Sequence, residues 1–475
     1  MEDHEWLTDN GADILRTASE ALENDLCDRC LGRLFGKAGF GLTNLERGKA
    51  VRIMLALSHE LLSDAQGEKV LPISGRLPVH PSRQSERTSE ELTQEDDDWT
   101  RAGTMSLTDY LGQEEQDKGC WLCHDVFDTI RDLAESVLES SLTQEFSSFM
   151  IGCRMDPGSL ERERIIWERS NPTSAETLKE ELNREIGKAY SELAPEKEFD
   201  RNNPEVTFLV DPLFKTVKVS IKPVFIKGRY RKLIRGIPQT RWICKSCRGK
   251  GCSRCSGKGK MYETSVEEII GEPMMSALEG DDFKLHGMGR EDVDVLTLGS
   301  GRPFVLEVSS PKKRSFDLNA LTSMVNKNGM GKVEVLDLEP SHRSEIVEVK
   351  DGTSLKRYRA RIMVEGEVDE ETLKYNISLL AQSPINQRTP QRVSHRRADK
   401  VRVRKVHSAS VTIEGEGVAI VDLLTDGGLY IKELLHGDEG RTTPSLASLL
   451  GLAVKVETLD VMDVLDDERS VMDQG

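Results

Sequence analysis

The spacing of the cysteines constrains this chain more than any other feature of its sequence. Of the nine cysteines in 475 residues, all but Cys153 fall into C-x-x-C pairs. A disulfide scaffold is typical of short secreted chains, whereas this chain is long and starts with acidic residues and no signal-type apolar stretch. We therefore expect reduced, metal-binding thiolates in a cytoplasmic protein. The pairs are Cys27/Cys30, Cys120/Cys123, Cys244/Cys247 and Cys252/Cys255.

The first two pairs predict one zinc site. Tetrahedral zinc takes four thiolate or imidazole ligands, and each C-x-x-C pair supplies two of them from one tight turn. Cys27, Cys30, Cys120 and Cys123 would then join two segments that are remote in the sequence. The alternative is that these cysteines are four reduced thiols in a core.

The last two pairs, which lie within residues 244–255, predict a compact zinc knuckle. Gly249, Gly251 and Gly257 permit its tight turns, although the four residues between the pairs make the closing segment short. Chaperone zinc modules share the same C-x-x-C-x-G-x-G spacing, so the motif alone indicates no function. A redox dithiol is the weaker alternative, since no thioredoxin-like βαβ pattern surrounds either pair.

The pattern of elements divides the chain near residue 262. Residues 1–262 combine helical periodicity at 9–22, from Thr43, at 125–141 and at 174–193 with alternating strands between 205 and 230. This part is predicted to be a zinc-containing α/β accessory domain. The stretch around 82–104 is almost entirely polar and is predicted to be an insertion.

Residues 263–475 predict an α+β domain. Strands at 293–298 and 302–308 flank Gly299-Ser300-Gly301, which predicts a hairpin. The order of the remaining elements favours a mixed, largely antiparallel sheet with helices on one side. Further strands are expected at 332–338, 356–364, 401–406, 408–413 and 417–423, and helices at 266–276, 369–380 and 445–452.

The charge of the chain is segregated. Its 65 Lys+Arg and 82 Asp+Glu give a net charge of −17, yet residues 212–260 carry fifteen Lys or Arg and no acidic residue. Residues 388–405 carry eight against Asp399 alone. Such tracts are typical of surfaces that neutralise phosphates, and the alternative is a solvated face that balances acidic helices. No apolar run is long enough to span a membrane.

Carboxylates are concentrated in Gly289–Val295, at the entry to the strand expected at 293–298. On a strand, Asp292 and Asp294 would point to one face and the valines between them to the other. A carboxylate beside a cation is suited to act as a nucleophile or base. A charged loop without catalytic function is the alternative.

The motifs around this segment resemble the archaeal and eukaryotic tRNA pseudouridine synthases that act at uridines 54 and 55 of the TΨC arm. The resemblance covers most of the chain and includes the cysteine pairs and a THUMP-like RNA-binding region. It also includes GREDVDV-x-x-LG-x-GRPF, K-x-Y, TP-x-RV-x-HRR and YIKEL-x-HGD-x-GRT-x-PS. One departure is Leu296, which stands where the family pattern has an arginine.

The resemblance implies a role for individual residues. Asp292 would be the catalytic aspartate and Arg290 a helper that orients it. Tyr358 would stack on the target base and take part in proton transfer, Lys432 would pair with the aspartate, and Leu459 would pack beneath the uracil. In the basic tract, substrate binding is expected for Arg392, Arg396 and Arg397.

Taken together, the sequence predicts an isomerase that converts uridine 55, and also uridine 54, to pseudouridine. Structural zinc and no organic cofactor are expected, with tRNA as partner, no membrane association and a monomeric state. The target nucleotide must leave its stack to react, so an RNA-gripping accessory domain is expected. The alternatives are a zinc-stabilised THUMP-type tRNA-binding protein or another tRNA modifier without isomerase activity, although no nucleotide-binding glycine loop is present.

Overall fold

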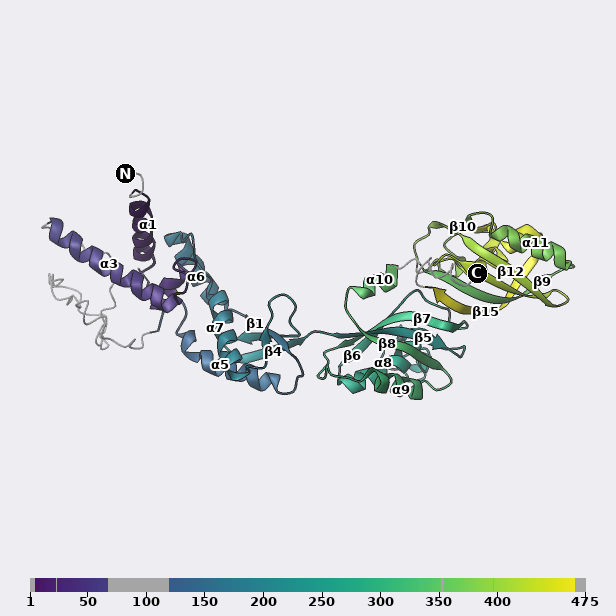
Figure 1. Ribbon diagram of the computed structural model, residues 1–475, viewed down its shortest axis with the longest axis horizontal. Coiled ribbons are helices and arrows are strands. Elements are labelled where there is room, and N and C mark those ends of the chain that lie inside the picture. The colour runs from purple at the N-terminus through teal and green to yellow at the C-terminus, as the bar shows by residue number, and fades with distance from the viewer. Residues whose placement is uncertain (1–4, 23, 67–118, 352–353, 396, 466–475) are drawn as a thin grey trace. The chain divides into compact units, whose positions relative to one another are not determined.

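The computed structural model describes residues 5–22, 24–66, 119–351, 354–395 and 397–465, and it forms two compact units (Figure 1). Unit 1 is Met1–Ser220 and unit 2 is Ile221–Gly475. The predicted insertion at 82–104 lies outside the described residues. In the part of the chain that is described, no helix is both long and apolar enough to cross a membrane.

The two units divide between Ser220 and Ile221. This division lies upstream of residue 262, near which the pattern of elements in the sequence predicts a domain boundary. The reason is the strand β5 (Val224–Lys232), which pairs antiparallel with β7 (Leu296–Ser309) and β8 (Val333–Ser341). This strand and the compact cysteine cluster that follows it are therefore part of unit 2.

Unit 1 is an α/β unit with a four-stranded sheet, counted over the described residues, in the order β2-β1-β3-β4. The central strand β1 runs parallel to β2 and β3. The rings of Phe149 and Tyr190, 4.7 Å apart, pack helix α7 on this sheet. The elements are α1 (Glu5–Ala21), α2 (Asp28–Arg33), α3 (Asn44–Gln66), η2 (Val126–Thr129), α5 (Ile130–Ser141), β1 (Ser148–Cys153), α6 (Pro157–Ser170), α7 (Leu178–Leu193), β2 (Glu198–Phe199), β3 (Val206–Asp211) and β4 (Thr216–Ile221).

Helix starts in unit 1 follow from local sequence. The Thr43 backbone N–H donates to the Glu46 carboxylate over 2.7 Å, and the Glu46 N–H donates to the Thr43 hydroxyl over 3.2 Å. Thr177 and Glu180 form the same reciprocal pair at the start of α7. These capping boxes satisfy N–H groups that a helix leaves free at its first turn. The helix predicted to begin near Thr43 is confirmed.

Unit 2 is an α+β unit built on a mixed sheet, which has eight strands over the described residues. Seven of them follow the order β12-β13-β9-β15-β7-β5-β8, and the eighth, β6, also pairs with β7. Among the described residues of this sheet, the strands pair antiparallel except β15 with β7, so the predicted fold class is confirmed. Its other elements are η3 (Ser253–Cys255), α8 (Val266–Leu278), β6 (Asp282–Gly287), α9 (Leu318–Asn328), α10 (Glu345–Asp351), β9 (Leu355–Glu365), α11 (Glu370–Leu380), β10 (Ile385–Arg388), η4 (Gln391–Val393), β11 (Val401–Arg404), β12 (Val406–Gly415), β13 (Val418–Thr425), α12 (Ile431–His436), η5 (Asp438–Gly440), β14 (Thr442–Thr443), α13 (Leu446–Leu450) and β15 (Ala453–Leu465).

The predicted hairpin at Gly299–Gly301 is wrong, because β7 passes through this segment as one strand. Tyr230 of β5 pairs with Arg302 and Lys232 pairs with Thr297, so the intervening residues form a bulge on the same partner strand. Both glycines have positive φ, at 59° and 79°, a conformation that serves a bulge as well as a reversal. The glycine pattern alone does not distinguish the two.

Counted over the described residues, two large hydrophobic cores lie on the sheet of unit 2, beside a small cluster of Phe225, Val305 and Ile346. One lies among β5–β8, α8 and α9, and the other among β9, β13, β15 and helices α11–α13. The two halves of the sheet meet where β7 and β15 run parallel, with Leu296 opposite Asp460 and Thr297 opposite Val461. The carboxylate motif immediately precedes this junction in the chain.

Candidate active site and metal centres

A pocket of about 140 Å³ lies in unit 2 and gathers side chains from both halves of the sheet. Its lining combines the segment before α8, the carboxylate motif, strands β9 and β15, and the segments η4 and α12. Seven predicted site residues line it together: Arg290, Asp292, Tyr358, Arg392, Arg397, Lys432 and Leu459. Arg396 lies outside the described residues.

Asp292 lies on a turn rather than on the expected strand. The Val295 N–H donates to the Asp292 carbonyl over 3.1 Å, and β7 begins only at Leu296. Asp292 and Asp294 therefore do not share a strand face. They are connected instead by Lys432, whose Nζ lies 2.8 Å from the Asp294 carboxylate and 4.0 Å from that of Asp292.

Arg392 is the nearer cation to the Asp292 carboxylate. Its Nη1 lies 3.0 Å from Asp292 Oδ2, and its Nε donates over 2.6 Å to Glu433, whose side chain is 1% exposed. The buried Glu433 thereby fixes the position of the Arg392 guanidinium. Asp292 itself is 34% exposed, so it stays accessible to a substrate in the pocket.

Lys432 also sets the charge state of Asp294. Partial burial opposes ionisation of Asp294, but the hydrogen bond and charge of Lys432 outweigh it and lower the pKa of that carboxyl. Asp294 is therefore an anion that holds the Lys432 ammonium beside the pocket.

Arg290 does not contact Asp292 in the structure. Its Nη2 donates to Thr240 Oγ1 over 2.9 Å, and its guanidinium lies over the Trp242 ring, 5.9 Å from the centroid. Among the described residues, the cations that pair with Asp292 are Arg392 and Lys432. The helper role predicted for Arg290 finds no support in this geometry.

Strand pairing brings the apolar wall together. Tyr358 on β9 lies opposite Val461 on β15, and Ala360 lies opposite Leu459. Since side chains alternate between the faces of a strand, these residues share one face. Tyr358 and Leu459 are 9% and 7% exposed. Burial raises the pKa of Tyr358 to about 12, so its phenol is protonated at neutral pH.

A buried polar network lies behind the motif. The side chains of Glu291 and Arg302 are 0% and 2% exposed and approach to 2.9 Å. The Tyr230 hydroxyl lies 2.9 Å from both Glu291 oxygens and accepts from Gln239 Nε2 over 2.8 Å. This network anchors the backbone that presents Asp292.

Lys232 holds the same backbone from β5. Its buried Nζ donates to the carbonyls of Asp292 over 3.0 Å, Val293 over 3.2 Å and Ile237 over 3.0 Å. Burial lowers its pKa, while nearby carboxylates oppose that effect. In the sequence it is one cation in a basic tract, and nothing there separates it from its exposed neighbours.

Lys356, at the start of the buried face of β9, lies near the same loop. A Cβ on Gly289 would come within 2.7 Å of its Nζ. Burial and the neighbouring charge of Arg302 lower the pKa of Lys356 to about 8, with Glu291 opposing them. The lysine is thus close to its titration point at physiological pH.

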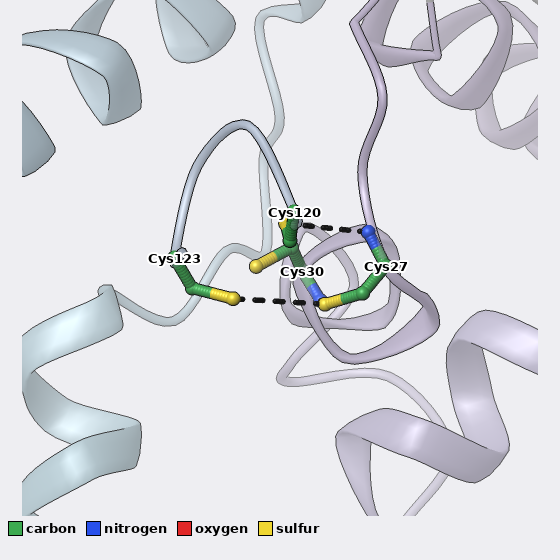
Figure 2. Close-up of side chains that lie close together, drawn as sticks. All are labelled: Cys27, Cys30, Cys120 and Cys123. Atoms are coloured by element: carbon green, nitrogen blue, oxygen red, sulfur yellow. Dashed lines mark hydrogen bonds between the residues drawn. The ribbon is translucent and has the colours of Figure 1, made fainter. Parts of the chain in front are cut away.

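The four cysteines of the first cluster converge, as Figure 2 shows. Their Sγ atoms lie within 4.8 Å of one another, and those of Cys27 and Cys123 are 3.8 Å apart. A tetrahedron with zinc–sulfur bonds of about 2.3 Å has edges of about 3.8 Å. Arg33, 1% exposed, places its Nη1 3.6 Å from Cys30 Sγ and 3.4 Å from the buried Glu181. The donor set therefore fits zinc, with a cation nearby to offset thiolate charge.

The compact cluster fits zinc equally well. Its Sγ pairs Cys244–Cys252, Cys247–Cys255 and Cys252–Cys255 are each 3.8 Å apart. Closure depends on glycines with positive φ: a Cβ on Gly251 would lie 2.6 Å from a carbonyl oxygen, and one on Gly259 would lie 2.3 Å from another. Backbone N–H groups of Gly251 and Gly259 donate to cysteine sulfurs over 3.2 Å. The short spacing thus closes without a steric conflict.

Cys153 is not part of either cluster. It ends β1 in unit 1, is 1% exposed, and burial raises its pKa to about 12. A buried thiol that stays protonated is neither a metal ligand nor a nucleophile.

Several residues at the site had no distinct signal in the sequence. Trp242 and Tyr430 line the pocket, and both lie near arginines, with Arg392 5.8 Å from the Tyr430 ring centroid. Glu433 follows the predicted Lys432 in the chain, but only the helix α12 turns it toward Arg392.

Family models match both units. Residues 133–211 match "Pus10 THUMP domain, archaeal", and residues 225–465 match "Pus10, C-terminal". These ranges agree with the described units and place the pocket within the second match.

Curated relatives match over nearly the whole chain. The tRNA pseudouridine synthase Pus10 of Methanothrix thermoacetophila is 40% identical over 96% of both chains. That of Methanopyrus kandleri is 39% identical over 93% of this chain and 96% of its own. That of Methanothermobacter marburgensis is 45% identical over 73% of this chain and 86% of its own. Among solved structures, a chain of a Cbf5-Nop10-Gar1 complex matches with 15% identity, a TM-score of 0.29 and 51% coverage of each chain.

Proposed function

The chain belongs to the Pus10 family of tRNA pseudouridine synthases, and on that premise we propose that it isomerises uridine 55, and also uridine 54, in the TΨC arm of tRNA. One observation carries the assignment of the chemistry. Asp292 presents a partly exposed carboxylate to a pocket where Arg392 and Lys432 lie 3.0 and 4.0 Å from it.

The reaction conserves every atom of the uridine. The N1–C1′ bond breaks, the uracil turns, and a C5–C1′ bond forms, while the proton on C5 is lost and N1 gains one. No electron acceptor, ATP or organic cofactor enters this balance. The protein must therefore supply orientation, electrostatic stabilisation and proton transfer.

Two routes for Asp292 are consistent with the site. In one, the carboxylate attacks C1′ as the N1–C1′ bond breaks, and the bond to Asp292 breaks in turn when C5 bonds to C1′. In the other, the carboxylate removes the C2′ proton as the N1–C1′ bond breaks and a glycal forms, and the proton returns to C2′ when C5 bonds to C1′. A primary isotope effect with 2′-deuterated uridine marks the glycal route. In both, Arg392 is held by Glu433 at a fixed position beside the reacting carboxylate.

The other pocket residues fit a flipped nucleotide. Leaving the stack has a free-energy cost, which stacking on an aromatic ring offsets. We assign that contact to Tyr358, which lines the pocket with Leu459 on the same wall. We propose that the other described arginines of residues 388–405, which do not line the pocket, contact the RNA backbone.

We assign one structural zinc to each cysteine cluster, held by Cys27, Cys30, Cys120 and Cys123 and by Cys244, Cys247, Cys252 and Cys255. The metal would supply cross-links between segments and no chemistry at the pocket. The THUMP-like part within residues 1–262 would add RNA contacts. A cytoplasmic location and a monomeric state stay predictions.

The test is incubation with an unmodified tRNA transcript, followed by mass-spectrometric mapping of pseudouridine. Product is expected at position 55 and at position 54 with the wild-type chain, and none with Asp292→Asn. Direct tRNA binding by the variant provides the control for folding. A wild-type chain that binds tRNA without forming product would favour the THUMP-type binding protein, and unchanged yield in the variant would exclude Asp292 as the catalytic residue.

A further inference from the structure

The compact cysteine knuckle lies next to the pocket, and this position suggests a function beyond local stability. Trp242, two residues before Cys244, lines the pocket and packs edge-on against Tyr262 with centroids 5.2 Å apart. Ile243 and Lys260 form a β-bridge that closes the base of the knuckle. The base of the knuckle is therefore part of the pocket wall.

The same base is bonded to the carboxylate motif. Gln239 Nε2 donates to the Gly289 carbonyl over 3.0 Å, and Arg290 donates to Thr240 over 2.9 Å. A ligand that contacts the knuckle is thus held at a defined position relative to Asp292, two residues after Arg290.

The knuckle is cationic and carries no compensating acid. Residues 242–260 contain no Asp or Glu. Arg241 and Lys260, at its base, form ion pairs with carboxylates of α8 and β6. Lys258 approaches Glu263 only to 3.9 Å. Four further cations are exposed and have no carboxylate partner among the described residues: Lys245, Arg248, Lys250 and Arg254.

These cations follow the pocket residue Trp242 closely in the chain. Lys245 stands three positions after Trp242 in the chain, so their Cα atoms are at most about 11 Å apart. Four cysteines around a zinc ion would keep the cations on a small rigid scaffold. Uncompensated, preorganised cations beside a nucleotide pocket are the chemistry that recognises a polyanionic backbone.

We propose that the Cys244–Cys255 knuckle is a phosphodiester-binding module that grips the tRNA backbone beside the target nucleotide through Lys245, Arg248, Lys250 and Arg254. This inference rests on the proposed function and deepens it, since it assigns a substrate contact to an element that otherwise has only a structural role.

The experiment compares two quadruple variants by equilibrium binding of a tRNA transcript across a salt series. One replaces Lys245, Arg248, Lys250 and Arg254 by Gln. The matched control replaces four exposed lysines of the same unit, on or near β6, α9 and β8, by Gln: Lys284, Lys312, Lys327 and Lys332. Both change the net charge equally, so a long-range charge effect would move both.

The knuckle variant is expected to bind tRNA at least tenfold more weakly. The slope of log affinity against log salt concentration should be smaller by about 3, because each lost phosphate contact lowers this slope by about 0.7–0.9. Its kcat/KM is expected to fall because KM rises. The control is expected to match wild type. Zinc content reports whether the knuckle stays folded.

Three outcomes would overturn the proposal: an unchanged affinity and salt slope, an equal effect of the control, or a preserved KM. Each leaves the proposed function intact if the wild-type chain forms pseudouridine, so the two failures are distinguishable. Should the quadruple variant lose zinc, Lys245→Gln with Lys250→Gln repeats the test, because neither side chain has a hydrogen bond or ion pair within the described residues. That pair is expected to lower the slope by about half as much.

Discussion

The Nζ of Lys232 lies 3.0 Å from the carbonyl oxygen of Asp292, and the ammonium is buried. A lysine of β5 thereby closes the turn that carries the proposed catalytic carboxylate. Because Lys232 contacts the backbone of Asp292, we expect it to affect the reaction by positioning that residue.

Lys232→Met is expected to lower kcat while tRNA affinity is kept. The substitution keeps the length of the side chain but leaves the carbonyls of Asp292 and Val293 without this donor, at a cost in unfolding free energy of about 1–3 kcal/mol. Kinetics and denaturant unfolding measure the two effects. Lys284→Met, on the exposed side of β6, is the control and should change neither.

Arg392→Met is expected to reduce both activity and stability. It removes the cation next to Asp292 and leaves the carboxylate of Glu433, 1% exposed, without its partner, which costs about 1–3 kcal/mol. A double-mutant cycle with Glu433→Gln measures the coupling, for which we expect about 0.5–3 kcal/mol. Additive effects would show that Glu433 does not position Arg392.

Tyr358→Phe separates the ring from its hydroxyl. The ring keeps its place on the pocket wall, so tRNA affinity should hold, while kcat is expected to fall about 100-fold if the phenol transfers a proton. Tyr358→Leu should lose affinity as well, because stacking is lost. Rates equal to wild type in Tyr358→Phe would remove the hydroxyl from the mechanism and leave stacking as its role.

The lowered pKa of Lys356 predicts a specific pH dependence of stability. Its pKa is about 8 in the folded chain, against 10.5 as its ordinary value, so between these values the unfolded chain binds more protons. Stability therefore rises with pH across that window, by up to about 3 kcal/mol. The difference in unfolding free energy between wild type and Lys356→Met, followed from pH 7.5 to 10, should increase; a flat difference would contradict the shift.

Metal analysis should return two zinc ions per chain. Cys120→Ser is expected to lower this to one and to destabilise unit 1, because the ligand pairs on two remote segments are no longer joined. Cys153→Ala is the control, since this buried thiol lies outside both clusters, and it should keep both ions. Fewer than two ions in the wild type would show that one cluster is a set of free thiols.

Much of the fold could be predicted from local pattern. Alternation and helical periodicity depend only on which face of an element is buried, so the strands at 206–210 and 356–364 and the helices at 266–276 and 369–380 lie where expected. The turn at Gly299–Gly301 could not be predicted, because glycine with positive φ serves hairpins and bulges alike. Pairing with β5 on both sides of it decides between them.

The candidate site shows the same limit. Asp292, Tyr358, Lys432 and Leu459 were identified by motif and do line one pocket. The carboxylate and its cation Arg392 are 100 residues apart in sequence, and only the packing of η4 and α12 beside the turn brings them to 3.0 Å. Arg290, which belongs to the same motif as Asp292, turns instead toward Thr240.

By itself, the sequence determined the ligand chemistry, the segregated charge and the order of elements, because residue type and short-range spacing set these properties. The four C-x-x-C pairs were visible without any fold, and so was the basic tract that contains two of them. Only the tertiary structure decided that the knuckle belongs to unit 2, that Lys232 bonds the backbone of the Asp292 turn, that Glu433 bonds Arg392, and which cation meets Asp292. These depend on long-range strand pairing and burial, which no local pattern encodes.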